Sequence, residues 1–511
     1  MKRALSLLLL VALAGGPLFA RAAEPAAPSA AAQAPQTAPG ETGDAVSQHV
    51  VNIDGRPIAY TARAGTLALR DGHNVETARV FYTAYTTGGS DRPVTFVYNG
   101  GPGSSTMWLR MGSIGPVRVA AANGTPGGPA PYRISDNPYS LLDKTDLVFI
   151  DMPDSGFGRI VAGKEKQFFG VDQDVAAFGQ FVSNYLTRFD RWNSPKFLFG
   201  ESYGTTRSAA LSDYLLDKGI FLNGVVLLSS ILNFGLDYGN GDPIAGGDWA
   251  YVLYLPTEAA TAWYHHKVAN APADLPTYLA QVKSFALGEY LDALAKGDKL
   301  GAAQRDDVVR KLSGYLGVPQ QFVRNANIRV SYDRFQRELL RGSAQVVGRL
   351  DGRFTTYDLD RASNEGPAWD PTDSAIDGAY TTAINQYLRQ TLGYDPPIPY
   401  RTNIYDIIYA GDSSWDFAHN HRYPTNVAPD LADAMAQEPN MKVFSANGYY
   451  DFATPFFATE YTLKHLGLSP QLQSNITFGF YQSGHMVYLN DAALPLFKAD
   501  LARWYDAALG H

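Results

Sequence analysis

The sequence of 511 residues contains no cysteine. This absence excludes disulfide bonds, cysteine nucleophiles and thiolate metal sites. A domain without disulfides must be stabilised by its hydrophobic core alone, and a chain of this length can form a large one. The sequence also lacks a recognisable metal-ligand cluster and a dinucleotide-binding glycine fingerprint. We therefore expect neither a metal ion nor a cofactor.

Clusters of basic residues are missing as well. The 42 Lys and Arg residues are scattered along the chain, and 50 Asp and Glu residues give a net charge of -8. A nucleic-acid-binding protein or a protein that binds anionic membranes usually carries a concentrated basic patch. The charge distribution therefore argues against both partners.

The apolar run near the amino terminus is too short to span a membrane. Residues 1–25, MKRALSLLLLVALAGGPLFARAAEP, contain two early basic residues, an apolar run that Gly-Gly-Pro interrupts at 15–17, and Ala-Arg-Ala at 20–22. This pattern is typical of a secretory signal peptide that is cleaved after Ala22, whereas a spanning helix needs roughly 20 apolar residues. Residues 23–43 are rich in Ala, Pro, Gln and Thr, which predicts a disordered leader. We expect an exported protein, periplasmic or secreted, with no membrane attachment after cleavage.

The rest of the chain predicts an α/β fold. From residue 48 onward, strand-like segments are separated by Asp-Gly turns at 54–55 and 71–72, which predicts N-terminal antiparallel hairpins. Short apolar runs then alternate with helix-length segments; the runs are VTFVY, LVFID, KFLFG, GVVLLSS, KVFSAN and ITFGFY. Continuous apolar runs of this kind form a mostly parallel central sheet that is flanked by helices.

The strand pattern stops between residues 234 and 401. This segment reads as helical and loop-rich, and strands return only at KVFSAN. The simplest prediction is one sheet domain, residues 44–233 and 402–508, interrupted by a helical cap insertion at 234–401. An insertion at the carboxyl ends of parallel strands would lie over an active site.

The segment GESYG at 200–204 places a serine between a predicted strand, KFLF, and a predicted helix, SAALSDYLL. The pattern G-x-S-x-G in this context is typical of the nucleophile elbow of α/β-hydrolases. Ser202 is held in a strained turn so that its hydroxyl projects from the sheet, and glycines on both sides let the strand and helix pass closely. Ser202 is therefore the candidate nucleophile.

A serine nucleophile needs a histidine base and an acidic residue, and in α/β-hydrolases both follow it in the chain. His485 lies in YQSGHMVYLN, just after the last predicted core strand, and this position favours it. The competing histidines are His419, His421, His265 and His266.

For the acid, Asp451 lies just after the preceding core strand, where its carboxylate could orient the imidazole. Asp412 and Asp416 are the alternatives, although no core strand leads to them.

A second glycine-rich turn, NGGPGSS at 99–105, also follows a predicted strand. It is not a phosphate-binding loop, because no Gly-Lys-Ser/Thr follows. In α/β-hydrolases the loop after this early strand supplies one backbone N–H to the oxyanion hole, and the residue after the nucleophile supplies the other. The expected donors are Gly101 and Tyr203.

Taken together, the motifs resemble those of the serine carboxypeptidase family. In the family's order they are YNGGPGSS (98–105), IGP (114–116), NPYSLL (137–142), DMPDSGFG (151–158), GESYG (200–204), NGYYD (447–451) and GHMVY (484–488). The resemblance implies a Ser202, His485 and Asp451 triad with Gly101 and Tyr203 as the oxyanion hole. It further implies that Asn99 and Glu201 hold the terminal carboxylate of a peptide substrate.

The chain departs from the family at two positions. Ser104 replaces the usual cysteine of the glycine-rich turn, and Ser113 stands where many members have a second carboxylate. The second change leaves specificity for carboxyl termini open. We expect an exported serine carboxypeptidase that acts on peptide or protein carboxyl termini. The alternatives are a prolyl aminopeptidase-like enzyme or esterase of the same fold, and a non-catalytic binding protein on this scaffold.

Overall fold

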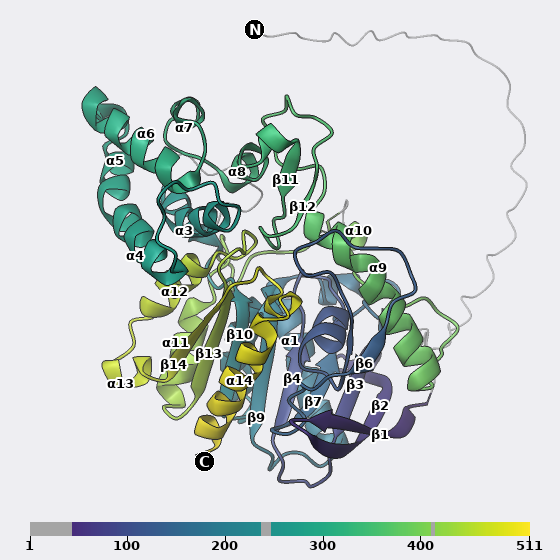
Figure 1. Cartoon of the computed structure of the whole chain (residues 1–511). Coiled ribbons are helices and arrows are strands. Elements are labelled where there is room, and N and C mark those ends of the chain that lie inside the picture. Colours follow the sequence, from purple (N-terminus) through teal and green to yellow (C-terminus); the bar gives the residue numbers. More distant parts are fainter. Residues whose placement is uncertain (1–42, 237–246, 410–413, 511) are drawn as a thin grey trace, which may run out of the picture. The chain divides into compact units, whose positions relative to one another are not determined.

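The computed structural model describes residues 43–236, 247–409 and 414–510 (Figure 1). All of them belong to one unit of the chain, Thr37–His511. The predicted signal peptide, nearly all of the predicted leader and the alternative acid Asp412 lie outside the described residues.

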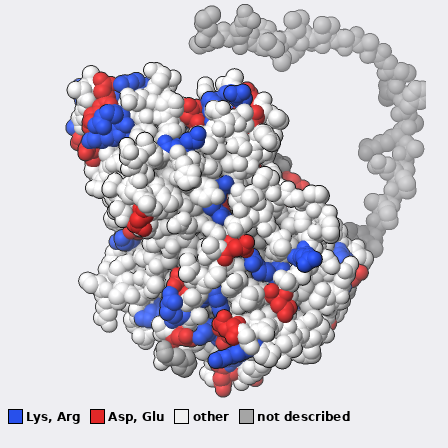
Figure 2. All heavy atoms as spheres, in the orientation of Figure 1, with Lys and Arg blue, Asp and Glu red and all other residues white. Residues whose placement is uncertain are grey.

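On the face shown in Figure 2, acidic and basic side chains are interspersed, and most of the surface between them carries neither charge. None of the helices in the described ranges combines the length and apolar character that crossing a bilayer requires.

The central element is a mixed sheet with the strand order β1-β2-β3-β7-β4-β9-β10-β13-β14, to which β8 adds a pairing with β3. Its strands are β1 (Ala45–Ile53), β2 (Arg56–Arg70), β3 (Glu76–Thr86), β4 (Val94–Tyr98), β7 (Asp146–Ile150), β8 (Arg159–Ile160), β9 (Lys196–Ser202), β10 (Gly224–Ser230), β13 (Lys442–Gly448) and β14 (Ile476–Tyr481). Strands β7, β4, β9, β10, β13 and β14 are parallel to their neighbours in this series. The predicted mostly parallel sheet is confirmed.

Helices cover both faces of the sheet because alternate residues of its strands point to opposite sides. Phe96 packs in one buried cluster with α1 (Val171–Arg188), α2 (Tyr203–Leu216) and α11 (Ala428–Gln437). Its neighbour Val97 packs in a second cluster with α14 (Ala493–Leu509) and α9 (Pro371–Gln386). The predicted α/β arrangement, a mostly parallel sheet flanked by helices, is therefore confirmed. The inner parallel strands β4, β7, β9, β10 and β13 read as continuous apolar runs because both of their faces are buried, whereas the edge strand β14 is partly exposed.

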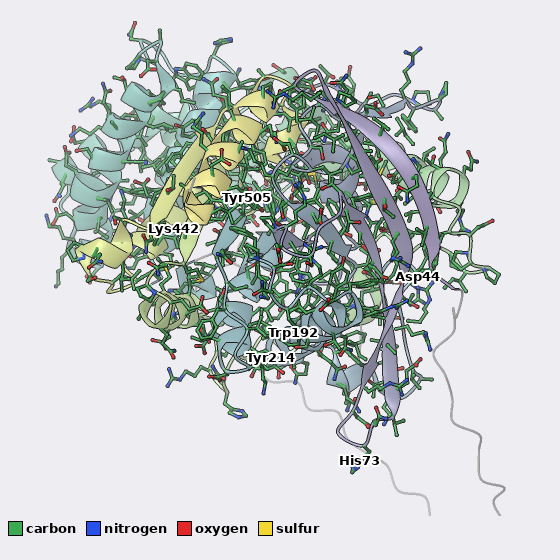
Figure 3. The ribbon with its side chains drawn as sticks, turned by 90° about the horizontal axis from the view of Figure 1, so that it is seen from below. Asp44, His73, Trp192, Tyr214, Lys442 and Tyr505 are labelled. Atoms are coloured by element: carbon green, nitrogen blue, oxygen red, sulfur yellow. The ribbon has the colours of Figure 1, made fainter. Side chains whose placement is uncertain are left out.

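The amino-terminal strands form the predicted antiparallel hairpins. Asp54 and Gly55 both have positive φ, 50° and 75°, and make a two-residue turn between β1 and β2. The β2–β3 connection is longer than a two-residue turn. The Asp71 carboxylate organises this loop by accepting hydrogen bonds from the backbone N–H groups of His73 and Val75. Figure 3 shows this hairpin projecting with His73 at its tip.

Between β10 and β13 the chain is mainly helical. The α-helices here are α3 (Trp249–Tyr264), α4 (Leu275–Phe285), α5 (Leu291–Lys296), α6 (Ala302–Leu316), α7 (Gln320–Asn325), α8 (Tyr332–Glu338), α9, α10 (Tyr405–Ile408) and α11. A small hairpin of β11 (Gln345–Val347) and β12 (Thr355–Tyr357), which the sequence did not predict, lies among them. Helices α3 to α8 share a third hydrophobic cluster with Tyr450, Phe452 and Phe456. The helical segment thus packs directly against the chain that follows β13.

The remaining described elements are short or peripheral. They are β5 (Val117–Val119), β6 (Ile134–Asp136), α12 (Phe456–Lys464), α13 (Pro470–Gln473) and the π-helical turns Leu109–Ser113, Ala286–Tyr290 and Tyr387–Thr391. Short 3-10 turns span Glu165–Gln167, Phe234–Leu236, Gly297–Lys299, Arg341–Ser343 and Val487–Leu489.

Candidate active site

Ser202 occupies the sharp turn between β9 and α2. Its backbone has φ 60° and ψ -131°, a strained conformation for a residue with a side chain. The residue is partly exposed, while its neighbours Glu201 and Tyr203 are buried. The turn therefore presents the Ser202 hydroxyl at the carboxyl end of the parallel strands, as the elbow pattern predicts.

Glycines at the elbow are required by close backbone contacts. A Cβ on Gly200 would lie 2.1 Å from the carbonyl oxygen of Gly204, and a Cβ on Gly100 would lie 2.4 Å from the backbone nitrogen of Tyr203. The second contact shows that the 99–105 turn runs directly against the start of α2. Gly101 is exposed with φ 107°. Tyr203 is the first residue of α2, where a backbone N–H has no helical partner. The two predicted oxyanion donors thus lie on adjoining segments.

His485 and Asp451 form a buried hydrogen-bonded pair. His485 Nδ1 lies 2.9 Å from Asp451 Oδ2, and the two residues are 3% and 0% exposed. Burial lowers the pKa of His485, but the Asp451 charge and hydrogen bond outweigh burial, so that this pKa is raised. The pair holds the proton on Nδ1 and leaves Nε2 as the acceptor.

The Asp451 carboxylate is held in place by the turn that follows it. Its Oδ1 accepts hydrogen bonds from the backbone N–H groups of Ala453 and Thr454, at 2.8 and 3.0 Å. The Thr454 hydroxyl lies 2.7 Å from Oδ2 and 3.1 Å from His485 Nδ1. Sequence reasoning missed Thr454, although it lies only three residues after the aspartate, a spacing that suits side-chain capping of a turn.

Strand β10 links the elbow to the histidine loop. Ser230 of β10 is paired with Ser202 of β9, and the hydroxyl of the preceding Ser229 donates to the His485 carbonyl oxygen at 2.6 Å. Within the described part of the chain, Ser202 Oγ itself makes no hydrogen bond. Nucleophile and base are often farther apart in a ligand-free enzyme than in its substrate complex.

The competing residues make other contacts or are exposed. His419 bridges Asp172 and Asp430, at 2.6 and 2.9 Å, and these carboxylates raise its pKa. His265 Nε2 contacts the carbonyl oxygen of Gly352. Asp416 caps its own loop by accepting from the Ala418 N–H. His266 and His421 are exposed.

Asn99 and Glu201 lie together beside the elbow. Asn99 Nδ2 donates to Glu201 Oε1 at 2.8 Å, and both side chains are nearly inaccessible. Burial raises the pKa of Glu201 to about 7, while the nearby charge of His485 opposes this rise. The Tyr488 hydroxyl also acts on this pKa, but in the described part of the chain neither it nor Glu201 Oε2 has a partner in hydrogen-bonding geometry.

The two positions that depart from the family pattern differ in their surroundings. Ser104 Oγ lies 2.6 Å from the hydroxyl of Tyr405 on α10, so that α10 packs against the glycine-rich turn. Ser113 is fully buried, and its hydroxyl has no hydrogen-bond partner among the described residues. In the described ranges no three His, Asp or Glu side chains gather as a metal site.

Comparison with known proteins agrees with the motifs. Residues 59–233 match the family model described as serine carboxypeptidase. The chain is 28% identical over 142 residues to serine carboxypeptidase-like 33 of Arabidopsis thaliana, covering 27% of this chain and 28% of the relative. It is 24% identical over 220 residues to the pheromone-processing carboxypeptidase KEX1 of Yarrowia lipolytica, covering 40% and 33%. The matches thus span about a third or less of each relative's own length.

Among solved structures, the chain is similar to a prohormone-processing carboxypeptidase from Saccharomyces cerevisiae. The identity is 16%, the TM-score is 0.48, and the match covers 88% of this chain and 92% of the other. A proline iminopeptidase from Mycobacterium smegmatis has 12% identity and a TM-score of 0.34, with 90% and 98% covered. The match of residues 59–233 confirms the predicted resemblance of this chain to the serine carboxypeptidase family.

Proposed function

We propose that this protein is a serine carboxypeptidase that removes carboxyl-terminal residues from peptides. The observation that carries the proposal is the buried 2.9 Å contact between His485 Nδ1 and Asp451 Oδ2 in the sheet whose strand β9 ends at the strained Ser202. In this proposal residues 44–233 and 402–508 form the catalytic domain, and residues 234–401 form a helical cap.

The proposed reaction is acyl transfer through Ser202. His485 Nε2 takes the Ser202 proton as Oγ attacks the scissile carbonyl carbon, and Asp451 stabilises the resulting imidazolium. The backbone N–H groups of Gly101 and Tyr203 stabilise the negative oxygen that develops on the carbonyl. His485 then gives the proton to the leaving amine. Water, deprotonated by the same base, hydrolyses the acyl-enzyme and restores the serine.

Recognition of the carboxyl terminus is assigned to Asn99 and Glu201. A carboxylate that enters a partly dry cleft needs hydrogen-bond donors, because an unpaired buried charge is costly. The Asn99 amide donates at every pH. The Glu201 carboxyl donates only when it is protonated, and its pKa of about 7 keeps it protonated in acid. The second carboxylate that Ser113 replaces is not required in this assignment, since burial, together with the Asp451 charge, already raises the Glu201 pKa.

The test compares a blocked dipeptide with its carboxyl-terminal amide. We expect kcat/KM to be higher for the free acid than for the amide below pH 7, and mass spectrometry of a longer peptide to show trimming from the carboxyl end. Equal values for acid and amide at every pH would indicate an esterase or another peptidase of this fold. Trimming from the amino end would indicate an aminopeptidase, and absence of turnover together with absence of fluorophosphonate labelling would indicate a binding protein.

We also propose that the protein is exported to the periplasm or secreted. The support is the sequence of residues 1–22, with its basic start, short apolar run and Ala-Arg-Ala site. Amino-terminal sequencing of the product from the native host should give Ala23. An intact Met1 terminus in the cytoplasmic fraction would contradict export.

A further inference from the structure

A short segment between β11 and β12, residues 349–353, lies against both loops that carry the proposed acid and base. The N–H of Gly352 donates to the Tyr450 carbonyl oxygen at 2.9 Å, and the Phe452 N–H donates to the Arg349 carbonyl oxygen at 3.0 Å. These bonds hold the chain immediately before and after Asp451. The His485 N–H donates to the Leu350 carbonyl oxygen at 2.6 Å. One segment of the helical region therefore fixes the backbone of both residues.

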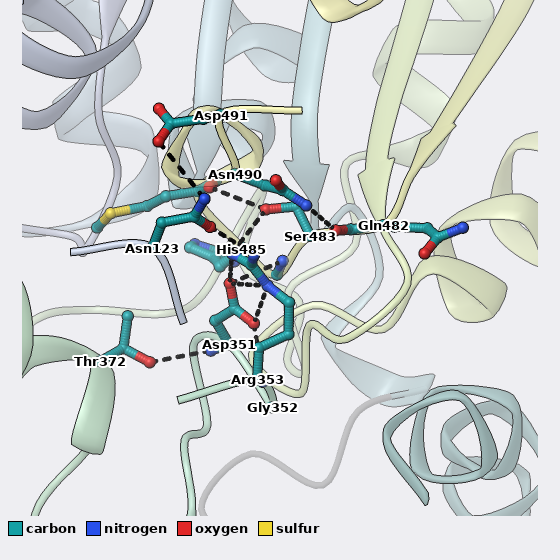
Figure 4. Close-up of polar contacts among 12 residues, drawn as sticks. Asn123, Asp351, Gly352, Arg353, Thr372, Gln482, Ser483, His485, Asn490 and Asp491 are labelled. Carbon is teal, nitrogen blue, oxygen red and sulfur yellow. Dashed lines mark hydrogen bonds and ion pairs between the residues drawn. The ribbon is translucent and has the colours of Figure 1, made fainter. Parts of the chain in front are cut away.

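A buried ion pair from this segment holds the turn before His485 (Figure 4). Asp351 and Arg353 are 0% and 5% exposed, and Arg353 Nη2 lies 2.7 Å from Asp351 Oδ2. The same Asp351 oxygen accepts a hydrogen bond from the Gly484 N–H at 3.1 Å. A Cβ on Gly484 would lie 2.4 Å from Asp351 Cβ, so that only glycine fits at position 484, between the ion pair and His485.

The Arg353 guanidinium extends the contact to a third segment. Its Nη2 lies 3.4 Å from Ser483 Oγ, and its Nη1 donates to Asn123 Oδ1 at 2.8 Å. Asn123 belongs to the loop between β5 and β6. A planar guanidinium can make these bonds at once because its donors are fixed in a fork.

We propose that Asp351 and Arg353 are positioning residues for His485. They touch neither the substrate nor the reacting atoms. They hold the 483–485 turn where the imidazole contacts Asp451, so that the helical region is part of the catalytic framework. This inference rests on the proposed function of His485 as the base.

The experiment uses the full-length protein and the variants Asp351→Asn and Arg353→Lys. Asparagine keeps the shape of Asp351 but loses the charge, and lysine keeps the charge of Arg353 but loses the fork. We expect kcat and the rate of fluorophosphonate labelling to fall together, up to about 100-fold, since a displacement of about 1 Å has that effect. KM should stay within about twofold of wild type, because Asn99 and Glu201 are untouched.

The matched control is Arg337→Lys. Arg337 and Asp358 form another buried pair in the same helical region, with Nε and Oδ2 3.2 Å apart and side chains 5% and 2% exposed. The Arg337 guanidinium forms an ion pair with Asp358, and its Nη1 donates to the Glu365 carbonyl oxygen; neither partner belongs to the catalytic loops. We expect this variant to lower Tm while kcat stays near wild type.

Wild-type labelling rates in folded Asp351→Asn and Arg353→Lys would overturn the proposal, as would an equal loss of kcat in Arg337→Lys. If neither variant folds, Asn123→Ala tests the proposal instead. Asn123 is half-buried, and its replacement by alanine removes only one contact of Arg353. A smaller fall in labelling supports the proposal, and an unchanged rate overturns it. If the wild-type protein itself is not labelled, the proposed function fails, and the positioning role fails with it.

Discussion

At the scale of single residues, the burial of Glu201 bears most directly on the proposed function. It precedes Ser202, donates no hydrogen bond when ionised, and lies within reach of the charges of His485 and Asp451. Burial raises its pKa to about 7, so the carboxyl changes its charge between mildly acid and mildly basic pH. The second carboxylate of many family members is therefore not needed to keep a proton here.

Glu201→Gln should remove the pH dependence of substrate binding. In the wild type we expect KM for a blocked dipeptide to be lowest below pH 7 and to rise through about pH 7, because the ionised carboxyl repels the substrate's carboxylate. Glutamine donates at every pH, so its KM profile should be flat. The matching amide substrate serves as the control, since it carries no carboxylate to repel. A wild-type KM that is the same at pH 5 and pH 8 would contradict the assignment.

Ser202 and His485 should act as a unit. Ser202→Ala and His485→Ala are each expected to lower kcat by about 10⁴-fold or more, and the double variant should be little worse than either. Steady-state rates on a blocked dipeptide measure this. Asp416→Asn is the control, because Asp416 caps a loop outside the site. Near-normal turnover by Ser202→Ala would show that the elbow serine is not the nucleophile.

At the scale of elements, the backbones of strand β9 and helix α2 lie so close together that no side chain fits between them at Gly200. The contact of Gly200 with Gly204 leaves no space for a Cβ, and the contact of Gly100 with Tyr203 brings a third segment to the same point. The elbow is therefore a packing feature shared by three segments, and its strain is maintained by buried strands on both sides.

Gly200→Ala should destabilise the protein by about 1–3 kcal/mol or more, since the new methyl group must displace backbone. Thermal unfolding followed by circular dichroism gives the change in Tm. Gly288→Ala is the matched control, because Gly288 lies in the helical turn Ala286–Tyr290 with open space around its Cα. That change should be neutral or stabilising by up to about 1 kcal/mol. A Gly200→Ala variant as stable as the wild type would contradict the close packing of the elbow.

The strands and the elbow could be predicted from sequence because their signals are local. The inner parallel strands are buried on both faces and read as apolar runs, and the glycines at 200 and 204 lie close to Ser202 in the sequence. The β2–β3 connection was predicted less well, because the Asp71 carboxylate organises a longer loop than an Asp-Gly turn.

The ion pair of Asp351 and Arg353 could not be predicted in this way. Its partners, Gly484 and Asn123, lie far away in the sequence, and DGR is an ordinary turn sequence without a motif. The family resemblance implied that Asn99 and Glu201 both bind a substrate carboxylate, but it did not give the hydrogen bond between them. The pKa of Glu201 depends on burial, which only the folded chain determines.

At the scale of the whole molecule, the order of segments along the chain divides the proposed catalytic machinery in two. Strand β10 pairs with β13, with Gly224 opposite Lys442, and the helical region lies between them in sequence. The nucleophile, the oxyanion loop and the carboxylate-binding pair come before this region, whereas Asp451 and His485 come after it. Contacts across such a separation form late, because the loop between them must first be closed. A nascent chain thus carries a serine without its base, and in the proposed mechanism the peptidase stays inert throughout its own synthesis.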